Sequence, residues 1–168
     1  MACEECGERH WRNPKPAAGT LTTLDGQLLL VRRAIEPWFG RWCAPSGFCE
    51  FDEHPIVTAE RETFEEAGVS VRVTGYLGTW MSHYAEDDLA GTGRDDDVVI
   101  AVAYYHAEPV GEPPAGVDRD EVSELGWFGA DELPSELAPP AALPRVLAAW
   151  RAAVRAGTTR SVLLDRPS

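Results

Sequence analysis

The pattern of apolar and polar positions divides the chain into strand-like and helix-like stretches. Apolar runs bounded by turn residues predict strands over residues 16–24, 27–33, 69–84, 98–107 and 122–128. Asp25-Gly26, between the first two runs, is typical of a hairpin turn. Residues 141–156 carry apolar side chains at helical spacing and predict a packing helix. This mixture predicts an α/β protein in which one mixed sheet is sandwiched between helices.

A second helix is predicted to begin at Pro55 and to end before Gly68. Proline fits the first turn of a helix, and glycine suits the left-handed residue just past its end. Because His54 is a poor N-cap residue, we expect Asp52 or Glu53 to cap the helix instead. One broad face is predicted to pack on the core, formed by Ile56, Val57, Ala59, Thr63, Phe64 and Ala67.

The opposite face of this helix carries three carboxylates. Glu62, Glu65 and Glu66 stand at positions i, i+3 and i+4, so they project from one side. Like charges at this spacing destabilise a helix, which indicates that a cation lies among them. Carboxylate oxygens suit hard divalent ions such as Mg²⁺ or Mn²⁺. The alternative is a solvated acidic surface, which would not require Gly47 and Gly68 at fixed intervals from these acids.

Residues 47–69 resemble the Nudix box, G-x5-E-x7-R-E-U-x-E-E-x-G-U, in which U is a bulky apolar residue. The fixed positions are filled by Gly47, Glu53, Arg61, Glu62, Glu65, Glu66, Gly68 and Val69. Thr63 departs from the pattern, because a larger apolar residue is usual there. The resemblance implies a Nudix hydrolase domain over residues 14–168, with its α/β/α sandwich over about 14–157, after a leader of residues 1–13.

The resemblance also implies metal-dependent hydrolysis of a diphosphate bond. Divalent ions would screen the charge of the bridging phosphates and lower the pKa of a bound water. The expected metal ligands are Gly47 through its carbonyl, Glu62, Glu65, Glu66 and Glu121. The products would be a nucleoside monophosphate and a phosphorylated remainder.

The general base stays open between a glutamate of the box and an acid from a later loop. Glu121 lies in a segment that resembles the family's Glu-x-x-Glu-x-x-Trp-Phe, so it is a candidate for the base or for a further metal ligand. Arg61 and Glu53 are expected to pair and to brace the box loop against the helix. The expected catalytic residues are therefore Glu53, Arg61, Glu65, Glu66 and Glu121.

Aromatic residues outside the box are the candidates for stacking on a nucleobase: Trp38, Phe39, Trp80 and Tyr84. ADP-ribose or a nucleotide sugar is the favoured substrate. NADH is an alternative, although the chain lacks the Ser-Gln-Pro-Trp-Pro-Phe-Pro stretch of NADH pyrophosphatases. A dinucleoside polyphosphate is another, because Tyr84 follows the box at a suitable distance. A nucleotide sensor without activity is a further alternative, but such sensors usually lose the box carboxylates that this chain keeps.

The net charge of −13 over 168 residues argues against a general nucleic-acid binder, which needs a basic surface. It also implies that an anionic substrate approaches only when cations screen the repulsion. No apolar run approaches the roughly 20 residues of a membrane span, and the N-terminus does not resemble a secretory signal. We therefore expect a cytoplasmic enzyme acting on small molecules, with a homodimer suggested by analogy to the family.

Cys3-x-x-Cys6-Gly7 has the form of a zinc knuckle, and residues 10–17 resemble the junction of Nudix hydrolases that carry an N-terminal zinc ribbon. The first knuckle of such a ribbon is missing. A closed structural Zn²⁺ site takes four ligands, and the chain offers Cys3, Cys6 and at most His10 nearby. The alternatives are a structural zinc site and a degenerate remnant. Residues 85–97, acidic and rich in glycine, predict a mobile loop or a lid.

Overall fold

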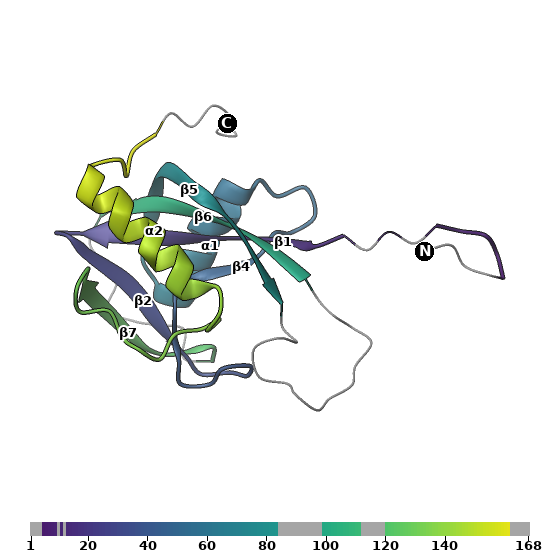
Figure 1. Ribbon diagram of the computed structural model, residues 1–168, viewed down its shortest axis with the longest axis horizontal. Coiled ribbons are helices and arrows are strands. Elements are labelled where there is room, and N and C mark those ends of the chain that lie inside the picture. The colour runs from purple at the N-terminus through teal and green to yellow at the C-terminus, as the bar shows by residue number, and fades with distance from the viewer. Residues whose placement is uncertain (1–4, 10, 12, 84–98, 112–119, 162–168) are drawn as a thin grey trace.

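The computed structural model describes residues 5–9, 11, 13–83, 99–111 and 120–161. The strands are β1 (Lys15–Leu24), β2 (Gln27–Arg33), β3 (Trp42–Cys43), β4 (Ser46–Phe48), β5 (Val71–His83), β6 (Val99–Pro109) and β7 (Val122–Gly129). The helices are α1 (Pro55–Ala67) and α2 (Leu143–Ala156). Figure 1 shows α2 across the near face of the sheet and α1 behind it. The predicted α/β class with a mixed sheet between helices is confirmed.

β1 is the central strand of the sheet. It pairs in parallel with β6, whereas the other pairings in the sheet are antiparallel, and the strand order is β3-β2-β1-β6-β5. The other edge of β1 is divided between two strands: residues 17–19 pair with β4, and residues 23–24 pair with β2. β7 pairs along β2. β4 and β2 therefore pair with different parts of the same edge of β1, and β7 extends the sheet beyond β2.

The two faces of the sheet carry cores of different size. The larger core lies under α2, which buries Leu143, Val146, Leu147 and Trp150. Full burial of side chains of this kind stabilises the fold by roughly 1.5–3 kcal/mol each. The smaller core lies under α1 and consists of Ala18, Ile56, Ala59, Val73 and Tyr105. The buried residues of α1 are Ile56, Thr58, Ala59, Thr63 and Ala67, which leaves the rest of its surface for other interactions.

Two expectations about α1 are wrong. His54 is the N-cap, because its Nδ1 accepts a hydrogen bond from the Ile56 N–H at 3.2 Å, so neither Asp52 nor Glu53 has that role. The predicted apolar face is also too broad, since Val57 and Phe64 are 42% and 55% exposed. The end of the helix is as predicted: Gly68 has φ 64° and donates its N–H to a carbonyl of the last turn.

Thr63, the residue that departs from the Nudix pattern, belongs to a chain of buried hydroxyl groups between α1 and β1. Its Oγ1 donates to the Ala59 carbonyl oxygen at 2.7 Å and lies 2.7 Å from Thr20 Oγ1, which lies 2.8 Å from Thr22 Oγ1. Because the single hydroxyl proton of Thr63 is donated to Ala59, Thr20 must donate to Thr63, and Thr22 must donate to Thr20. The three threonines are fully buried yet satisfied.

Several smaller expectations were tested as well. β5 is continuous through the glycines that were expected to break it. Its register shifts between Val73 and Gly75 and between Tyr76 and Gly78, which indicates a bulge next to each glycine. Residues 130–134 form a turn where a short piece of helix was expected. Within the described ranges, no helix is long and apolar enough to cross a membrane. The predicted loop 85–97 and Tyr84 lie outside the described residues.

Candidate active site

All the glutamates that the sequence marks as functional, except Glu53, line one cleft of about 830 Å³. This volume is within the range of ligand pockets, roughly 300–1,000 Å³. The cleft is bordered by α1, β4, the end of β2 and the residues that precede β7. It brings together the predicted site residues Gly47, Arg61, Glu62, Glu65, Glu66 and Glu121. Glu121, far from the box in sequence, thus faces the same space as the helix carboxylates.

Arg61 organises the side of the cleft nearest the loop before α1. Its Nε and Nη2 each donate to a different carboxylate oxygen of Glu53, at 2.9 Å. Its Nη1 donates to Glu62 and Glu65 at 2.8 Å, and Nη2 also donates to the Phe48 carbonyl oxygen at 3.2 Å. These five bonds match the five N–H donors of a guanidinium. The expected brace between Glu53 and Arg61 is therefore present.

Both carboxylate oxygens of Glu53 accept hydrogen bonds. Besides the bonds from Arg61, its Oε2 accepts a hydrogen bond from Thr58 Oγ1 at 2.8 Å and from the Glu50 N–H at 3.1 Å. The hydrogen bonds from Arg61 are the main reason that the pKa of Glu53 is lowered to about 2, against the opposing effect of burial. Glu53 is thus a permanently charged anchor that positions Arg61 and the loop.

Glu62 explains why position 47 is glycine. Its carboxylate lies against the α-carbon of Gly47, where a β-carbon on that residue would collide with all three carboxylate atoms. A side chain at position 47 would therefore push Glu62 out of the cleft. Burial is the largest cause that raises the pKa of Glu62 above its ordinary value, and the charges of Glu65 and Glu121 add to it.

Glu66 is the least compensated acid of the cleft. Its Oε2 accepts one hydrogen bond, from the Ser46 N–H at 3.1 Å. Burial is the main cause that raises the pKa of Glu66 to about 8, and the negative charges of Glu62 and Glu121 contribute to the shift. Ionising Glu66 is therefore costly, although the charge of Arg33 opposes the shift.

The backbone of β4 presents a different carbonyl group to the cleft from the one expected. The Thr20 N–H donates to the Pro45 carbonyl oxygen at 3.0 Å, so alternation along the antiparallel ladder also turns the backbone groups of Gly47 toward β1. Ser46, between these pairs, turns its backbone the other way and donates its N–H to Glu66. The geometry therefore favours the carbonyl oxygen of Ser46 over that of Gly47 as a ligand, and sequence reasoning missed Ser46.

The donor set suits a divalent cation, although it is not arranged around one. Among the described residues, no three acidic, His or Cys side chains are positioned to hold a single ion. Arg61 is one physical reason, because it draws Glu62 and Glu65 toward itself. Carboxylate oxygens are nevertheless the preferred ligands of Mg²⁺ and Mn²⁺, and a bound cation would offset the cost of ionising Glu66, whose pKa is raised mainly by burial.

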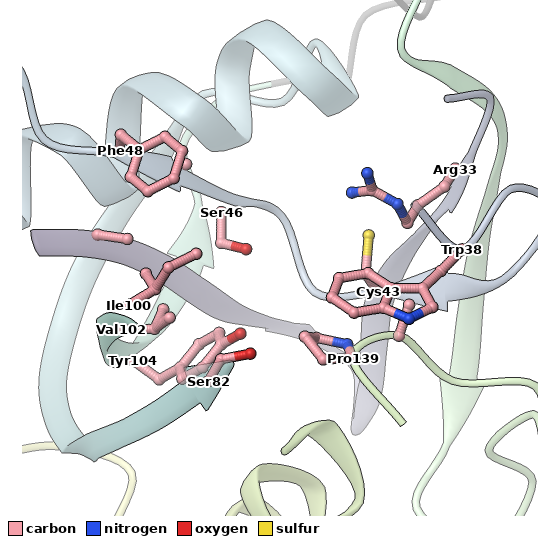
Figure 2. A pocket seen from close by; sticks show the side chains of 13 residues that line it. Arg33, Trp38, Cys43, Ser46, Phe48, Ser82, Ile100, Val102, Tyr104 and Pro139 are labelled. Atoms are coloured by element: carbon pink, nitrogen blue, oxygen red, sulfur yellow. The ribbon is translucent and has the colours of Figure 1, made fainter. Parts of the chain in front are cut away.

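A second hollow adjoins the acidic cleft and shares with it Arg33, Ser46, Gly47 and Phe48. Figure 2 shows this cavity, with Trp38 and Arg33 on one side and Ile100, Val102, Tyr104 and Ser82 on the other. Trp38 is thus one predicted stacking residue that the structure places beside the acids. Arg33 and the strand residues of this cavity were not predicted, because they come together only through the packing of distant segments.

The other aromatic candidates have different surroundings. Phe39 is 64% exposed and lines neither the cavity nor the cleft among the described residues. Trp80 packs edge-on against Tyr104, with ring centroids 6.1 Å apart, as part of the core under α2. Of the predicted zinc ligands, Cys6 is an exposed free thiol, and Cys3 lies outside the described residues together with His10. The zinc site therefore stays a prediction.

Comparisons with known proteins agree with the fold. The profile of the NUDIX domain family matches residues 13–150. A MutT-like protein of Streptomyces ambofaciens is 31% identical over 123 residues, which cover 72% of this chain and 67% of that protein. The chain belongs to the Nudix family, and it is a Nudix hydrolase.

More distant relatives carry more specific names. An ADP-ribose pyrophosphatase of Methanocaldococcus jannaschii is 29% identical over 126 residues, covering 75% of this chain and 68% of that protein. An NAD-capped RNA hydrolase of Pseudomonas aeruginosa is 28% identical over 136 residues, covering 80% of this chain but 43% of that protein. A NUDIX hydrolase structure from Nitrosomonas europaea has a TM-score of 0.69 at 23% identity, covering 96% of this chain and 83% of that one, which shows the shared fold.

Proposed function

We propose that this Nudix hydrolase cleaves the diphosphate bond of a nucleoside diphosphate linked to a further group, with ADP-ribose or a nucleotide sugar as the favoured class. The observation that carries the proposal is the cleft in which Glu62, Glu65, Glu66 and Glu121 face one another. Burial, together with the charges of Glu62 and Glu121, disfavours ionisation of Glu66, so the acids of this cleft suit a reaction at an anion only if cations are recruited.

Mg²⁺ or Mn²⁺ bound in the cleft would screen the diphosphate and lower the pKa of a bound water. The residues of the chain then have separate tasks. Glu62 and Glu66 are less exposed than Glu65 and Glu121 and would serve as ligands with the Ser46 carbonyl oxygen. Arg61 and Glu53 hold the loop against the helix. Water adds to one phosphorus atom, the bridging P–O bond breaks, and the leaving phosphate takes the bonding electrons.

The proton of the attacking water passes to a carboxylate. Glu65 and Glu121 are the candidates for this base, because both line the cleft and are more exposed than Glu62 and Glu66. Glu65→Gln and Glu121→Gln separate them. Loss of the base lowers kcat and removes the acidic limb of its pH profile, because the base acts only when it is deprotonated, whereas loss of a ligand weakens the apparent affinity for Mg²⁺.

The substrate class is supported by the relatives, since one is named an ADP-ribose pyrophosphatase and another acts on NAD-capped RNA. The test is hydrolysis of ADP-ribose, a UDP-sugar, NADH and a dinucleoside tetraphosphate, each with Mg²⁺, with Mn²⁺ or with EDTA. We expect a nucleoside monophosphate among the products, formed only with a divalent ion. Tight binding of one nucleotide without cleavage of any would refute the proposal and would favour the sensor.

A further inference from the structure

A pocket of about 400 Å³ lies at the end of the sheet where β1 turns into β2 and where α2 ends (Figure 1). We call it the hairpin pocket; it is lined by residues 23–25, Thr74, residues 106–109, Val154 and Thr159. It shares no lining residue with the acidic cleft or with the cavity of Figure 2. Thr23 is four residues along β1 from Gly19, which pairs with β4 beside the cleft, so roughly 13 Å of strand separates the two places. The hairpin pocket is therefore a separate site.

His106, from β6, is the buried polar side chain of the hairpin pocket. It is 3% exposed, and its Nδ1 has no hydrogen-bond partner among the described residues. Burial lowers the pKa of His106, so the ring is neutral at pH 7 and one of its nitrogens is an acceptor. A buried polar atom without a partner costs folding free energy. Its place in the wall of an open pocket indicates a partner that the chain does not supply.

Two hydroxyl groups of the same pocket have already donated their protons. Thr74 Oγ1 donates to the Thr159 carbonyl oxygen at 3.2 Å. Thr23 Oγ1 donates to the Leu21 carbonyl oxygen at 3.5 Å and accepts a hydrogen bond from Trp150 Nε1 at 3.2 Å. Because a hydroxyl group has one proton and two lone pairs, each of these oxygens can offer an incoming ligand only an acceptor. A ligand of this pocket must therefore be a hydrogen-bond donor.

The charges around the hairpin pocket favour a positive ligand. Asp25 and Glu108 bring two carboxylates to its lining, and within the described ranges no lysine or arginine lines it. Arg160 donates to both oxygens of Glu108, at 2.7 and 2.6 Å, whereas Asp25 forms no ion pair with a described residue. The last turn of α2, which ends at Gly157, adds the negative end of the helix dipole.

We propose that the hairpin pocket is a second binding site, for a small organic cation that carries N–H donors on an apolar stem, the class of the alkyl diamines. One ammonium group donates to the acceptor nitrogen of His106. The stem lies along Leu24 and Val154, and the other ammonium group pairs with Asp25. The inference does not depend on the proposed function, because the two sites have no residue in common.

The test is the binding of 1,4-diaminobutane to the full chain in excess Mg²⁺, followed by the amide NMR spectrum. We expect saturable shifts at residues 23–25 and 106–108 and none at the carboxylates of α1. Two analogues separate the parts of the ligand. 1,4-Butanediol has the same stem without charge, and the bis-trimethylammonium analogue keeps the charge without N–H donors. Each should bind about tenfold more weakly or less, as expected for the loss of charged hydrogen bonds.

Variants of the pocket test the two ends of the ligand. His106→Phe keeps a flat ring and removes the acceptor, so it should weaken the diamine by about tenfold or more. It should not lower the midpoint of urea unfolding, because the atom without a partner is removed as well. Asp25→Asn should weaken the diamine by about threefold or more, since this carboxylate is exposed. Arg160→Gln should strengthen it, because Glu108 is released.

Asp52→Asn is the matched control for Asp25→Asn. Both aspartates are exposed and both have a positive φ, 65° at Asp52 and 50° at Asp25, a conformation that asparagine tolerates. The two changes therefore alter the net charge equally, but Asp52 does not line the hairpin pocket. Asp52→Asn should bind the diamine within about twofold of the wild type.

Several results would overturn the inference. If the diamine gives no saturable shifts at residues 23–25 and 106–108 by about 10 mM, the pocket holds solvent only. Equal binding by wild type and a folded His106→Phe, or by Asp25→Asn and Asp52→Asn, would mean that the diamine is attracted by the net charge of the chain alone. Equal binding of the diamine and 1,4-butanediol would show that the stem decides. None of these readouts uses hydrolysis, so failure of the proposed function leaves the test intact.

Discussion

Glu53 and Glu66 are glutamates on the two sides of Arg61 in the Nudix box, and their environments are opposite. Glu53 accepts four hydrogen bonds, including two from Arg61, and its pKa is lowered to about 2. Glu66 accepts one, from a backbone N–H, and its pKa is raised to about 8. Burial opposes ionisation of both: the hydrogen bonds from Arg61 outweigh it at Glu53, whereas at Glu66 burial is the largest cause of the shift. The protein itself supplies the hydrogen-bond donors of Glu53, whereas Glu66 is left with an oxygen that a bound cation could use.

The largest effect on activity is expected from replacing Glu66 with an uncharged residue. Glu66→Gln should lower kcat/KM on the order of 10²–10³-fold, because a metal ligand is worth several kcal/mol of transition-state stabilisation. The metal-free variant should be at least as stable as the wild type, since an uncompensated buried carboxylate is gone. Steady-state kinetics and urea unfolding measure the two. Glu124→Gln, on an exposed acid paired with Arg32, is the control. Undiminished activity of Glu66→Gln would show that its charge has no catalytic use.

A second test follows the pH dependence of stability in protein kept free of metal with EDTA. Glu66, raised from 4.5 to about 8, binds a proton more tightly when folded, so its contribution is largest below about 4.5 and is lost as pH rises to about 8. Glu53, lowered from 4.5 to about 2, behaves in the opposite way: its contribution is present above 4.5 and is lost as pH falls toward 2.

The measurement is the difference in unfolding free energy between wild type and each glutamine variant across this range. The difference should change by at most about 1.4 kcal/mol per pH unit for one group. For Glu66→Gln it should vary between about pH 4.5 and 8, and for Glu53→Gln below pH 4.5. Parallel curves for both variants would show that their surroundings do not differ as described.

A third test removes the ion pair between Glu53 and Arg61. Glu53→Gln removes the anion that receives two bonds from Arg61, so we expect a loss of about 1–3 kcal/mol in unfolding free energy. Arg61 would then be free to move toward Glu62 and Glu65, and the affinity for Mg²⁺ should fall as well. Urea denaturation and Mg²⁺ titration report the two effects. Unchanged stability would mean that the brace is solvated and weak.

The sequence predicted what depends on local spacing. The helix 55–67, its end at Gly68 and the convergence of its carboxylates follow from one helical repeat and one turn residue. The cap at His54 was missed because an imidazole caps a helix only when its ring is suitably oriented. Arg33 and the cavity beside it gave no signal, because the end of β2, the strand β6 and residues 138–139 meet through the sheet topology alone. The exposure of Phe64 was missed because the small core under α1 covers less of the helix than its apolar content suggests.

The smallest effect is expected at the buried threonines on the core side of α1. These residues test whether hydrogen-bond partners also decide the energy of neutral buried groups. In the chain from Thr22 through Thr20 and Thr63 to Ala59, each of the three hydroxyl protons has one acceptor. Thr63→Val removes the acceptor of Thr20 and should cost about 1–2 kcal/mol of unfolding free energy, as a buried donor is left unsatisfied. The double variant Thr20→Val with Thr63→Val should cost less than the sum of the single changes, since the orphaned donor is removed too. Strict additivity of the unfolding free energies in urea would show that the hydroxyl groups act independently. Hydrogen-bond partners would then matter only for the charged residues of the helix.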